Sequence, residues 1–372
     1  MRITAPSLLL ALGLAAPAAA DTFTVSPGGP LPTVQAGLDA ASPGDTVLVL
    51  EGTYPGDFVN TKSLIVVRGL GSVVLVGNGA FVGAKKCAFL NFTVNGTGDA
   101  LDVDGNSHGN LFSNLTLTSG GAGTVAMRVS GNRNVVTKSI AAASDVAFEI
   151  DGSFNLVSKC LAVPGTGDDG FDIGGERNLV TTCAAAGMGG DGFDVGGRAN
   201  LVVKSAANGC AQAGFRVGGP GNALLGCAAD QNVESGLTFE GNGSSAQKCR
   251  FGVVAGNAGP GVAFDGADGN LLARCLVTNN GGEGVVLGTF GNGRDNRIER
   301  NRVMNNAGDG ILLSSSGNAD DNWVEKNLVT ANGGGGIVVQ SDHNVILKNK
   351  VSGNVGTPLD NTGTGNLVDG NK

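Results

Sequence analysis

The stretch that decides the fold runs from residue 155 to residue 219 and reads NLVSKCLAVPGTGDDGFDIGG, ER, NLVTTCAAAGMGGDGFDVGG, RA, NLVVKSAANGCAQAGFRVGG. It is one unit written three times, because the opening Asn recurs at Asn155, Asn178 and Asn200. A period of 22 to 23 residues with two short apolar runs and a Gly-rich turn is too short for a strand-helix-strand unit. We therefore expect each unit to form one coil of a parallel β-solenoid.

The fifth residue after that Asn sets the register of the coils. It is Asn, Cys or Ser in eleven coils: Ser139, Cys160, Cys183, Ser205, Cys227, Cys249, Cys275, Asn301, Asn327, Asn349 and Asn371. Asn91 and Asn114 extend this series backwards to thirteen coils if one residue is dropped from the spacing there. Around it, Ile298, Asn301 and Val303 alternate with charged residues, as in a strand with one buried face. A buried Asn is tolerated only when its amide is hydrogen-bonded, and stacked coils supply partners. We therefore expect the side chains at this position to point into the solenoid and to stack on one another as a ladder along its axis.

The composition fits one long solenoid without a linker. The chain has 372 residues, of which 65 are Gly, and a solenoid has no size limit because each coil contacts only its neighbours. A net charge of −8 argues against a general nucleic-acid binder. The seven cysteines are odd in number and five lie in the ladder, so we expect buried free thiols, with Cys87 and Cys210 as potential exceptions.

Residues 1–20 have the pattern of a secretory signal. Arg2 precedes an apolar run, and three alanines end at Ala20 before Asp21. The run is too short to span a bilayer, and we expect no transmembrane segment elsewhere. The sequence thus predicts a secreted or cell-surface protein whose signal is cleaved near Ala20.

Residues 32–41, LPTVQAGLDA, place Val34, Leu38 and Ala41 on one face of a helix. The stretch from Thr33 to Tyr54 resembles the N-terminal part of the pectin-lyase-like superfamily of right-handed parallel β-helices. The resemblance implies an all-β solenoid with a capping helix, which we divide into 21–83 (cap helix and first coils) and 84–372 (repeats) of one continuous domain. We predict about 12 to 13 coils of about 22 residues.

A file of outward residues on the third strand of each coil is the candidate site. It comprises Asp102, Arg128, Glu149, Asp172, Asp194, Arg216, Thr238, Ala263, Val286, Leu312 and Val338. Carboxylates one coil apart repel unless one is protonated or a cation lies between them, and Ca²⁺ accepts several carboxylate oxygens. We therefore interpret Glu149, Asp172 and Asp194 as a candidate calcium site.

The layout is similar to that of pectate lyases, in which calcium and an arginine base act on the same kind of strand. The resemblance implies that Arg216, with Glu149, Asp172 and Asp194, corresponds to that site. We assign catalytic roles to Arg216 and to the adjacent Asp169 and Asp191. The paired motifs Asp169-Gly-Phe-Asp172 and Asp191-Gly-Phe-Asp194 also resemble polygalacturonase-type hydrolases, but that family's His falls at Ala213 and its Arg-Lys motif is absent. If the protein is an enzyme, a lyase is favoured over a glycoside hydrolase.

A simpler interpretation needs no chemistry in this file. Asp turns the chain and Gly takes the unusual backbone angle that follows, so duplication of the repeat copies Asp-Gly without function. The apolar half of the file, Ala263 to Val338, is either a binding patch or a covered surface.

A second file consists of the residues just before the ladder positions. Eight of ten are basic: Lys138, Lys159, Lys204, Lys248, Arg274, Arg300, Lys326 and Lys348, with Thr182 and Gly226 as the others. Since the ladder residue points inward, these side chains point outward and form a basic stripe on another face, either a solvated surface or a site for an anionic polymer. We assign substrate binding to Lys248, Arg274, Arg300, Lys326 and, in the first file, Arg128.

The sequence thus predicts a secreted solenoid that binds, and as a calcium-dependent lyase processes, an acidic polysaccharide or cell-surface glycan. The alternative is a non-catalytic structural or adhesive solenoid, which the short turns favour because solenoid enzymes usually need walls around a cleft. We also expect residues 352–363 to fold back over the C-terminal coil, or a partner to cover it, since an open solenoid end exposes strand edges.

Overall fold

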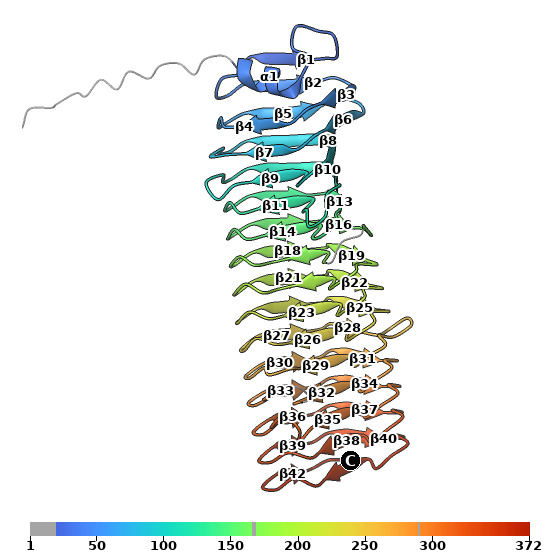
Figure 1. Cartoon of the computed structure of the whole chain (residues 1–372). Coiled ribbons are helices and arrows are strands. Elements are labelled where there is room, and N and C mark those ends of the chain that lie inside the picture. Colours follow the sequence, from blue (N-terminus) through green and yellow to red (C-terminus); the bar gives the residue numbers. More distant parts are fainter. Residues whose placement is uncertain (1–19, 166–168, 289–290) are drawn as a thin grey trace, which may run out of the picture.

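The computed structural model describes residues 20–165, 169–288 and 291–372. Over these residues the chain winds into an elongated parallel solenoid, with the N-terminal coils at one end and the C-terminal coils at the other (Figure 1). The predicted secretory signal falls, except for Ala20, outside the described residues.

Each coil contributes three short strands, which stack in three files. The strands of the first file stack along the solenoid axis and form one part of a 28-stranded parallel sheet, here called sheet A. Its strands are β1 (Thr22–Val25), β2 (Thr46–Val49), β5 (Val66–Gly69), β8 (Ala88–Gly96), β10 (Leu111–Ser119), β12 (Val135–Thr137), β15 (Leu156–Ser158), β18 (Leu179–Thr181), β21 (Leu201–Val203), β24 (Ala223–Leu225), β27 (Ser245–Gln247), β30 (Leu271–Ala273), β33 (Arg297–Glu299), β36 (Trp323–Glu325), β39 (Val345–Leu347) and β42 (Leu367–Asp369).

The second file also belongs to sheet A and is joined to the first by a short bend, which from β12 onward consists of two residues in each coil, such as Lys138 and Ser139. The long strands β8 and β10 run through this bend and contribute to both files. The remaining strands are β3 (Gly52–Pro55), β6 (Val73–Val76), β13 (Ile140–Ala142), β16 (Leu161–Ala162), β19 (Ala184–Ala186), β22 (Ala206–Asn208), β25 (Ala228–Asp230), β28 (Arg250–Phe251), β31 (Leu276–Thr278), β34 (Arg302–Met304), β37 (Leu328–Thr330) and β40 (Lys350–Ser352).

The third file is a separate 14-stranded parallel sheet, here called sheet B. Its strands are β4 (Phe58–Asn60), β7 (Gly79–Phe81), β9 (Leu101–Val103), β11 (Met127–Val129), β14 (Phe148–Ile150), β17 (Phe171–Asp172), β20 (Phe193–Asp194), β23 (Phe215–Val217), β26 (Leu237–Phe239), β29 (Val262–Phe264), β32 (Val285–Leu287), β35 (Ile311–Leu313), β38 (Ile337–Val339) and β41 (Leu359–Asn361).

The prediction of an all-β parallel solenoid is confirmed, but its 12 to 13 coils are too few. The structure has about 16 turns, because the strands β1, β2 and β5 form coils that precede Asn91. These first coils carry no Asn, Cys or Ser ladder residue at the predicted position, so the repeat that revealed the later coils is not visible there.

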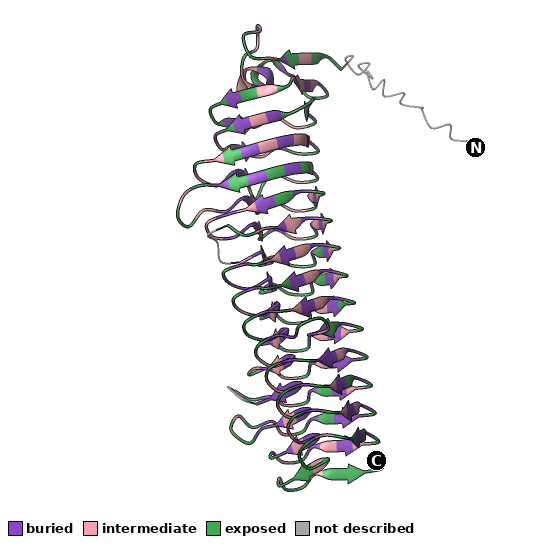
Figure 2. Ribbon diagram, turned by 90° about the vertical axis from the view of Figure 1, so that its right-hand side faces the viewer, coloured by how far each residue is buried: buried purple, intermediate pink, exposed green. Residues whose placement is uncertain are grey.

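The core is a narrow tube of small apolar side chains lined by phenylalanines. Alternate residues are buried in most strands, and Figure 2 shows this alternation along the sheet. The rings of Phe148, Phe171, Phe193 and Phe215 stack with centroids 4.9, 4.6 and 4.9 Å apart. Offset or parallel rings at this spacing stabilise the stack beyond the burial of their area, and they keep sheet B in register.

Asn ladders run at three corners rather than at one. The predicted ladder is present, since Asn301, Asn327 and Asn349 are each about 1% exposed and the backbone N–H of Asn301 donates to Oδ1 of Asn327 at 2.8 Å. The second ladder is the opening Asn of each unit: the N–H of Asn155 donates to Oδ1 of Asn178 at 2.7 Å. The third follows the second file and comprises Asn232, Asn257, Asn280, Asn306, Asn332 and Asn354.

The backward extension of the ladder to Asn91 and Asn114 is wrong. Strand pairing sets Ser113 opposite Thr137, so Asn114 lies beside Lys138 in the bend and not beside the buried Ser139. Asn91 and Asn114 have φ of 66° and 56° and their side chains reach the surface. Asn is the side chain that most readily adopts this left-handed conformation, which explains its presence at the bend.

The predicted helix is present as α1 (Val34–Ala40), beginning after the N-cap residue Thr33, whose hydroxyl accepts the N–H of Ala36 at 3.1 Å. Val34 and Leu38 are buried, as expected. The strand β1 precedes the helix and pairs with β2, so the solenoid sheet begins before α1 (Figure 1). The capping role of α1 stays a prediction.

The thiol predictions hold for every described cysteine. All seven are free and buried, including Cys87 and Cys210. Residues 352–363 do not fold back, because β41 continues sheet B by pairing with β38. The last coil leaves Leu367 55% exposed, and a partner at this end stays a prediction. No helix among the described residues is long and apolar enough to cross a membrane.

Candidate functional site

The outward file of sheet B has the register that the sequence predicts. Arg128 pairs with Asp102 on one side and Glu149 on the other, and Asp194 pairs with Asp172 and Arg216. The middle residue of each strand points outward because its two neighbours are buried in the core, as Phe215 and Val217 are on either side of Arg216. The polar half of the file therefore forms a continuous surface over β9, β11, β14, β17, β20 and β23.

Arg216 is the centre of the densest part of this surface. Its Nε lies 2.7 Å from Oδ2 of Asp191, its Nη1 lies 3.2 Å from Oε1 of Glu240, and its Nη2 donates to Oε1 of Gln212 at 3.3 Å. Burial by itself lowers the pKa of Arg216, but the neighbouring carboxylates Asp191 and Glu240 raise it above its ordinary value. The guanidinium therefore stays protonated and is unsuited to the role of a base.

Asp191 is a buried carboxyl group that links three coils. It is 2% exposed, its Oδ1 accepts the N–H of Ala213 at 2.8 Å, and its own N–H donates to Oδ1 of Asp169 at 2.6 Å. Burial raises the pKa of Asp191 to about 7, although Arg216 opposes that rise. The structure thus brings together the three predicted catalytic residues, Arg216, Asp191 and Asp169.

The more accessible acids of the file also hold protons unusually well. Burial raises the pKa of Asp172 to about 6, with Asp194 as the next contributor, and burial raises the pKa of Asp194 against the effect of Arg216. Burial raises the pKa of Glu149 to about 7, with Arg128 opposing. Groups whose pKa values lie near neutrality, as those of Asp172 and Glu149 do, are the ones that can act as acids and bases.

The calcium site at Glu149, Asp172 and Asp194 stays a prediction. Glu149, Asp172 and Asp194 lie on three successive strands, and no group of three or more His, Cys, Asp or Glu side chains in the described parts of the chain converges as metal ligands do. Proton binding, together with Arg216 and Arg128, offsets the repulsion between these carboxyls instead. We derive no chemical step through a metal.

Arg128 is less available to a substrate than the sequence suggests. Its Nη2 lies 3.4 Å from Asp99 and 3.1 Å from Glu149. Asp99 in turn accepts the N–H of Val125 at 2.8 Å through its other oxygen. Arg128 therefore neutralises two acids of its own surface, and it lies three coils from Asp194.

Sequence reasoning missed Asp99, Glu240, Glu283 and Asp265 as members of this face. Glu283 precedes Val285 by two residues, as Asp191 precedes Phe193, so the register of the repeat was a signal that pointed to it. Asp265 and Glu240 each directly follow a strand of sheet B. The same register pointed to Asp99, which precedes Leu101 by two residues. No comparable signal paired Glu240 with Arg216, because that contact depends on side-chain direction.

The apolar half of the file lines a hollow of about 310 Å³ beside the acidic half. Ala263, Val286 and Leu312 form its floor, with the carboxylates of Asp265 and Glu283 also among its lining residues. The predicted apolar patch therefore continues the same face and is not covered by the C-terminal segment. Val338, the last predicted member, lies beside Leu312 in the next coil.

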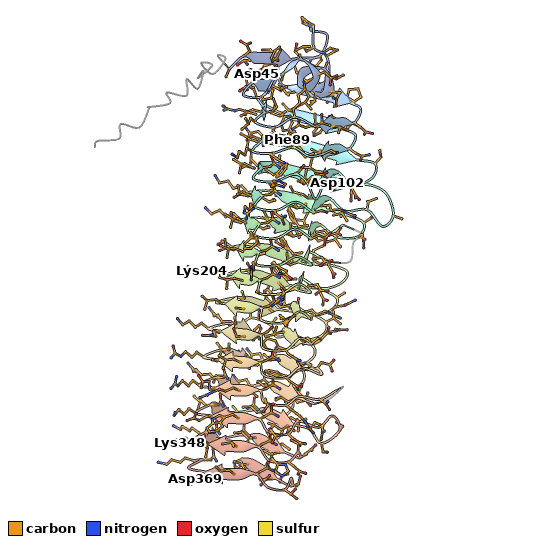
Figure 3. All side chains as sticks on the ribbon, turned by 90° about the vertical axis from the view of Figure 1, so that its left-hand side faces the viewer. Asp45, Phe89, Asp102, Lys204, Lys348 and Asp369 are labelled. Atoms are coloured by element: carbon orange, nitrogen blue, oxygen red, sulfur yellow. The ribbon has the colours of Figure 1, made fainter. Side chains whose placement is uncertain are left out.

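The remaining predicted substrate-binding residues lie on another edge of the solenoid. Lys248, Arg274, Arg300 and Lys326 occupy the bend between the first and second files, with φ between 56° and 57°. Figure 3 shows the bend residues Lys204 and Lys348 on the opposite edge of the molecule from Asp102. The structure does not bring this basic stripe together with the acids of sheet B.

Comparisons with known proteins agree with this architecture. A family model described as "Right handed beta helix region" matches residues 245–372, and the comparison with curated proteins gave no match. The A-module of the mannuronan C-5 epimerase AlgE4 of Azotobacter vinelandii is similar at a TM-score of 0.61 and 15% identity, over 91% of this chain and 95% of that one. A mannuronic acid-specific polysaccharide family 6 lyase from human gut microbiota gives 0.57 and 12%, over 88% and 87%.

A tailspike receptor binding domain of siphovirus 9NA is also similar, at a TM-score of 0.58 and 11% identity, over 91% of this chain and 74% of that one. Likenesses at this identity establish a fold and not an activity. The stacked coils and these likenesses define an all-β solenoid wound in right-handed turns. The chain therefore has the right-handed parallel β-helix fold that its sequence resemblance to the pectin-lyase-like superfamily implies.

Proposed function

We propose that the chain binds an acidic polysaccharide along the outer face of sheet B, centred on Arg216. The observation that carries the proposal is one protonated guanidinium held among carboxyl groups whose pKa values lie near neutrality, on the outer face of a straight parallel sheet. Neighbours in fold act on mannuronan or mannuronic acid polymers, or bind a receptor, which agrees with an extended glycan as the ligand.

A negatively charged sugar on an acid-rich face needs those acids to be protonated. A sugar carboxylate has an ordinary carboxyl pKa and stays charged at mildly acidic pH, whereas Asp172 and Glu149 take up protons at pH about 6 and about 7. The face then carries the positive charges of Arg216 and Arg128 with fewer opposing charges. We therefore expect polyuronate binding to strengthen as the pH falls from about 8 to about 5.

Processing of the bound polymer is the finer part of the proposal. In an elimination, a base takes the proton beside the uronate carboxylate and the C4–O bond to the neighbouring sugar breaks. The electron pair of that bond leaves on the sugar oxygen, which an acid protonates, and an unsaturated uronate remains. Arg216 would hold the substrate carboxylate, and Asp172 and the Asp191–Asp169 pair would carry the proton. Calcium dependence remains part of this proposal, and the assay below therefore compares samples with and without calcium.

A non-catalytic role is the second candidate, and one observation favours it. Arg216 is already contacted by Asp191, Glu240 and Gln212. The described turns beside it are short, with six residues between Asp194 and Leu201 and six between Asn208 and Phe215. Such a face binds a polymer without excluding water from it. In this case the protein would act as an adhesive or structural solenoid, exported as its N-terminal sequence predicts.

The test combines binding and turnover on defined polymers. Affinities for polymannuronate, polygalacturonate and a neutral glucan are measured with and without calcium, while the absorbance of unsaturated uronate is followed. We expect Arg216→Gln to weaken polyuronate binding about tenfold, since a charge-assisted contact is lost, and the exposed control Arg198→Gln to bind normally. Binding without product would support the adhesive role, and equal affinity for the neutral glucan would refute acidic specificity.

A further inference from the structure

The basic stripe occupies a backbone conformation that does not favour Lys or Arg. Its eight members, defined above from Lys138 to Lys348, all have φ between 49° and 57°. Residues with a Cβ adopt this left-handed conformation at a cost in conformational free energy, which only Gly avoids and which Asn tolerates best. The local backbone therefore does not explain why basic residues recur here.

The chain itself shows that other residues fit the same bend. Gly226 and Gly370 occupy it in two coils, and Asn91 and Asn114 occupy it in the first coils. The bend in each coil is fixed by hydrogen bonds between strands, as where the N–H of Lys204 donates to the carbonyl of Leu225 at 2.9 Å. Gly or Asn would complete these coils equally well, so the charge is the property that the basic residues add.

Electrostatics within the protein does not explain the stripe either. All eight side chains are exposed, and adjacent coils place like charges roughly 4.8 Å apart along the axis. Arg300 and Lys326 lie beside Glu299 and Glu325, at 3.9 and 2.5 Å. The other members, which make no ion pair with any residue that the structure describes, are Lys138, Lys159, Lys204, Lys248, Arg274 and Lys348.

We propose that this stripe is a second binding line, separate from sheet B, which holds an extended anionic polysaccharide parallel to the solenoid axis. Nine coil steps separate Lys138 from Lys348, so the line is about 43 Å long. Its charges lie in single file, which matches a straight chain with one anionic group per sugar. The proposal goes beyond the function assigned to Arg216 and does not depend on it.

Two observations favour a polysaccharide over a nucleic acid. The phosphates of a duplex follow two helical strands at a spacing of about 3.4 Å and leave a straight line after a few base pairs, while the protein as a whole carries −8. The residues beside the N-terminal part of the stripe are hydroxylic, with Thr137 Oγ1 and Ser158 Oγ 2.9 Å apart. Hydroxyls suit sugars, whereas single-stranded nucleic acids bind on aromatic platforms.

The chain offers a variant that removes charge without disturbing the bend. In the stripe variant, Lys204→Gly, Lys248→Gly and Arg274→Gly introduce the residue that Gly226 already presents at this position. The matched control replaces three exposed cations outside the stripe, Lys85→Gln, Arg198→Gln and Arg250→Gln. Both triple variants change the net charge equally, so a difference between them reports position and not overall charge.

Binding is measured with polygalacturonate, polymannuronate and a DNA duplex at low salt, in wild-type and Arg216→Gln backgrounds. We expect the stripe variant to bind the polyuronates roughly tenfold more weakly and the control to bind as wild type, with the same factor in both backgrounds. Equal losses in both triple variants, no loss in the stripe variant, or loss of duplex binding alone would overturn the proposal. Failure of the sheet B site would appear separately, as no effect of Arg216→Gln.

Discussion

At the scale of single residues, the position of an Asn in the coil determines its contribution. Asn114 lies at the bend with φ 56° and its side chain reaches the surface, whereas Asn178 is 1% exposed and fully hydrogen-bonded. Oδ1 of Asn178 accepts the N–H of Asn155 at 2.7 Å, and its Nδ2 donates to the carbonyl of Gly152 at 2.9 Å. Each buried Asn therefore satisfies backbone groups of the preceding coil that water cannot reach.

Asn178→Ala is expected to destabilise the solenoid by about 2 kcal/mol. The substitution leaves the buried N–H of Asn155 and the carbonyl of Gly152 without their partners, and an unpaired buried group costs about 1 to 3 kcal/mol. Urea denaturation followed by circular dichroism measures the change. The exposed Asn95→Ala is the control, and an equal effect of the two substitutions would contradict a special role for the ladder.

At the scale of elements, sheet B combines a predictable register with unpredictable contacts. The alternation around Phe193 and Phe215 was enough to predict that Asp194 and Arg216 point outward on adjacent strands. That alternation carries no information on how far an Arg side chain reaches, so the pairing of Arg216 with Glu240 on the next coil was not predicted. The raised pKa values likewise depend on burial, which neighbouring coils create together.

The same distinction explains the error in the number of coils. Repeats were counted from the Asn, Cys and Ser ladder, and the first coils pack without it. The calcium site stays a prediction because it rests on the spacing of Glu149, Asp172 and Asp194 along the axis, whereas metal ligands must converge on one point. Periodicity therefore predicts which residues lie in one file along the axis, but it does not predict which side chains converge on one point.

Arg216→Gln is expected to raise the pKa of Asp191 further above its ordinary value. The carboxyl is already held near pH 7 by burial, and Arg216 at 2.7 Å is the main group that lowers this pKa. Titration of the ¹³C carboxyl signal of Asp191 measures the shift. Asp194→Asn serves as a comparison and should lower the pKa of Asp191, because Asp194 contributes to raising it. A fall in the pKa after Arg216→Gln would exclude the ion pair.

At the scale of the whole molecule, one row of partly buried acids should determine how stability depends on pH. The folded state raises the pKa of Asp172 from 3.8 to about 6, of Asp191 from 3.8 to about 7, and of Glu149 from 4.5 to about 7. In this range the folded chain binds more protons than the unfolded chain. Folding is therefore favoured at low pH, and that contribution is lost as the pH rises through the folded-state values.

We therefore expect the melting temperature to fall as the pH rises from about 4.5 to about 7.5 and to level off above that. Acids whose pKa is lowered, such as Asp45 and Asp342 with their backbone hydrogen bonds, act in the opposite direction only below this window. The double substitution Glu149→Gln and Asp172→Asn should flatten the slope, since two of the three titrating groups are removed. Calorimetry in buffers of constant ionic strength measures it, and a melting temperature that rises through this window would show that these carboxyls are ionised in the folded chain.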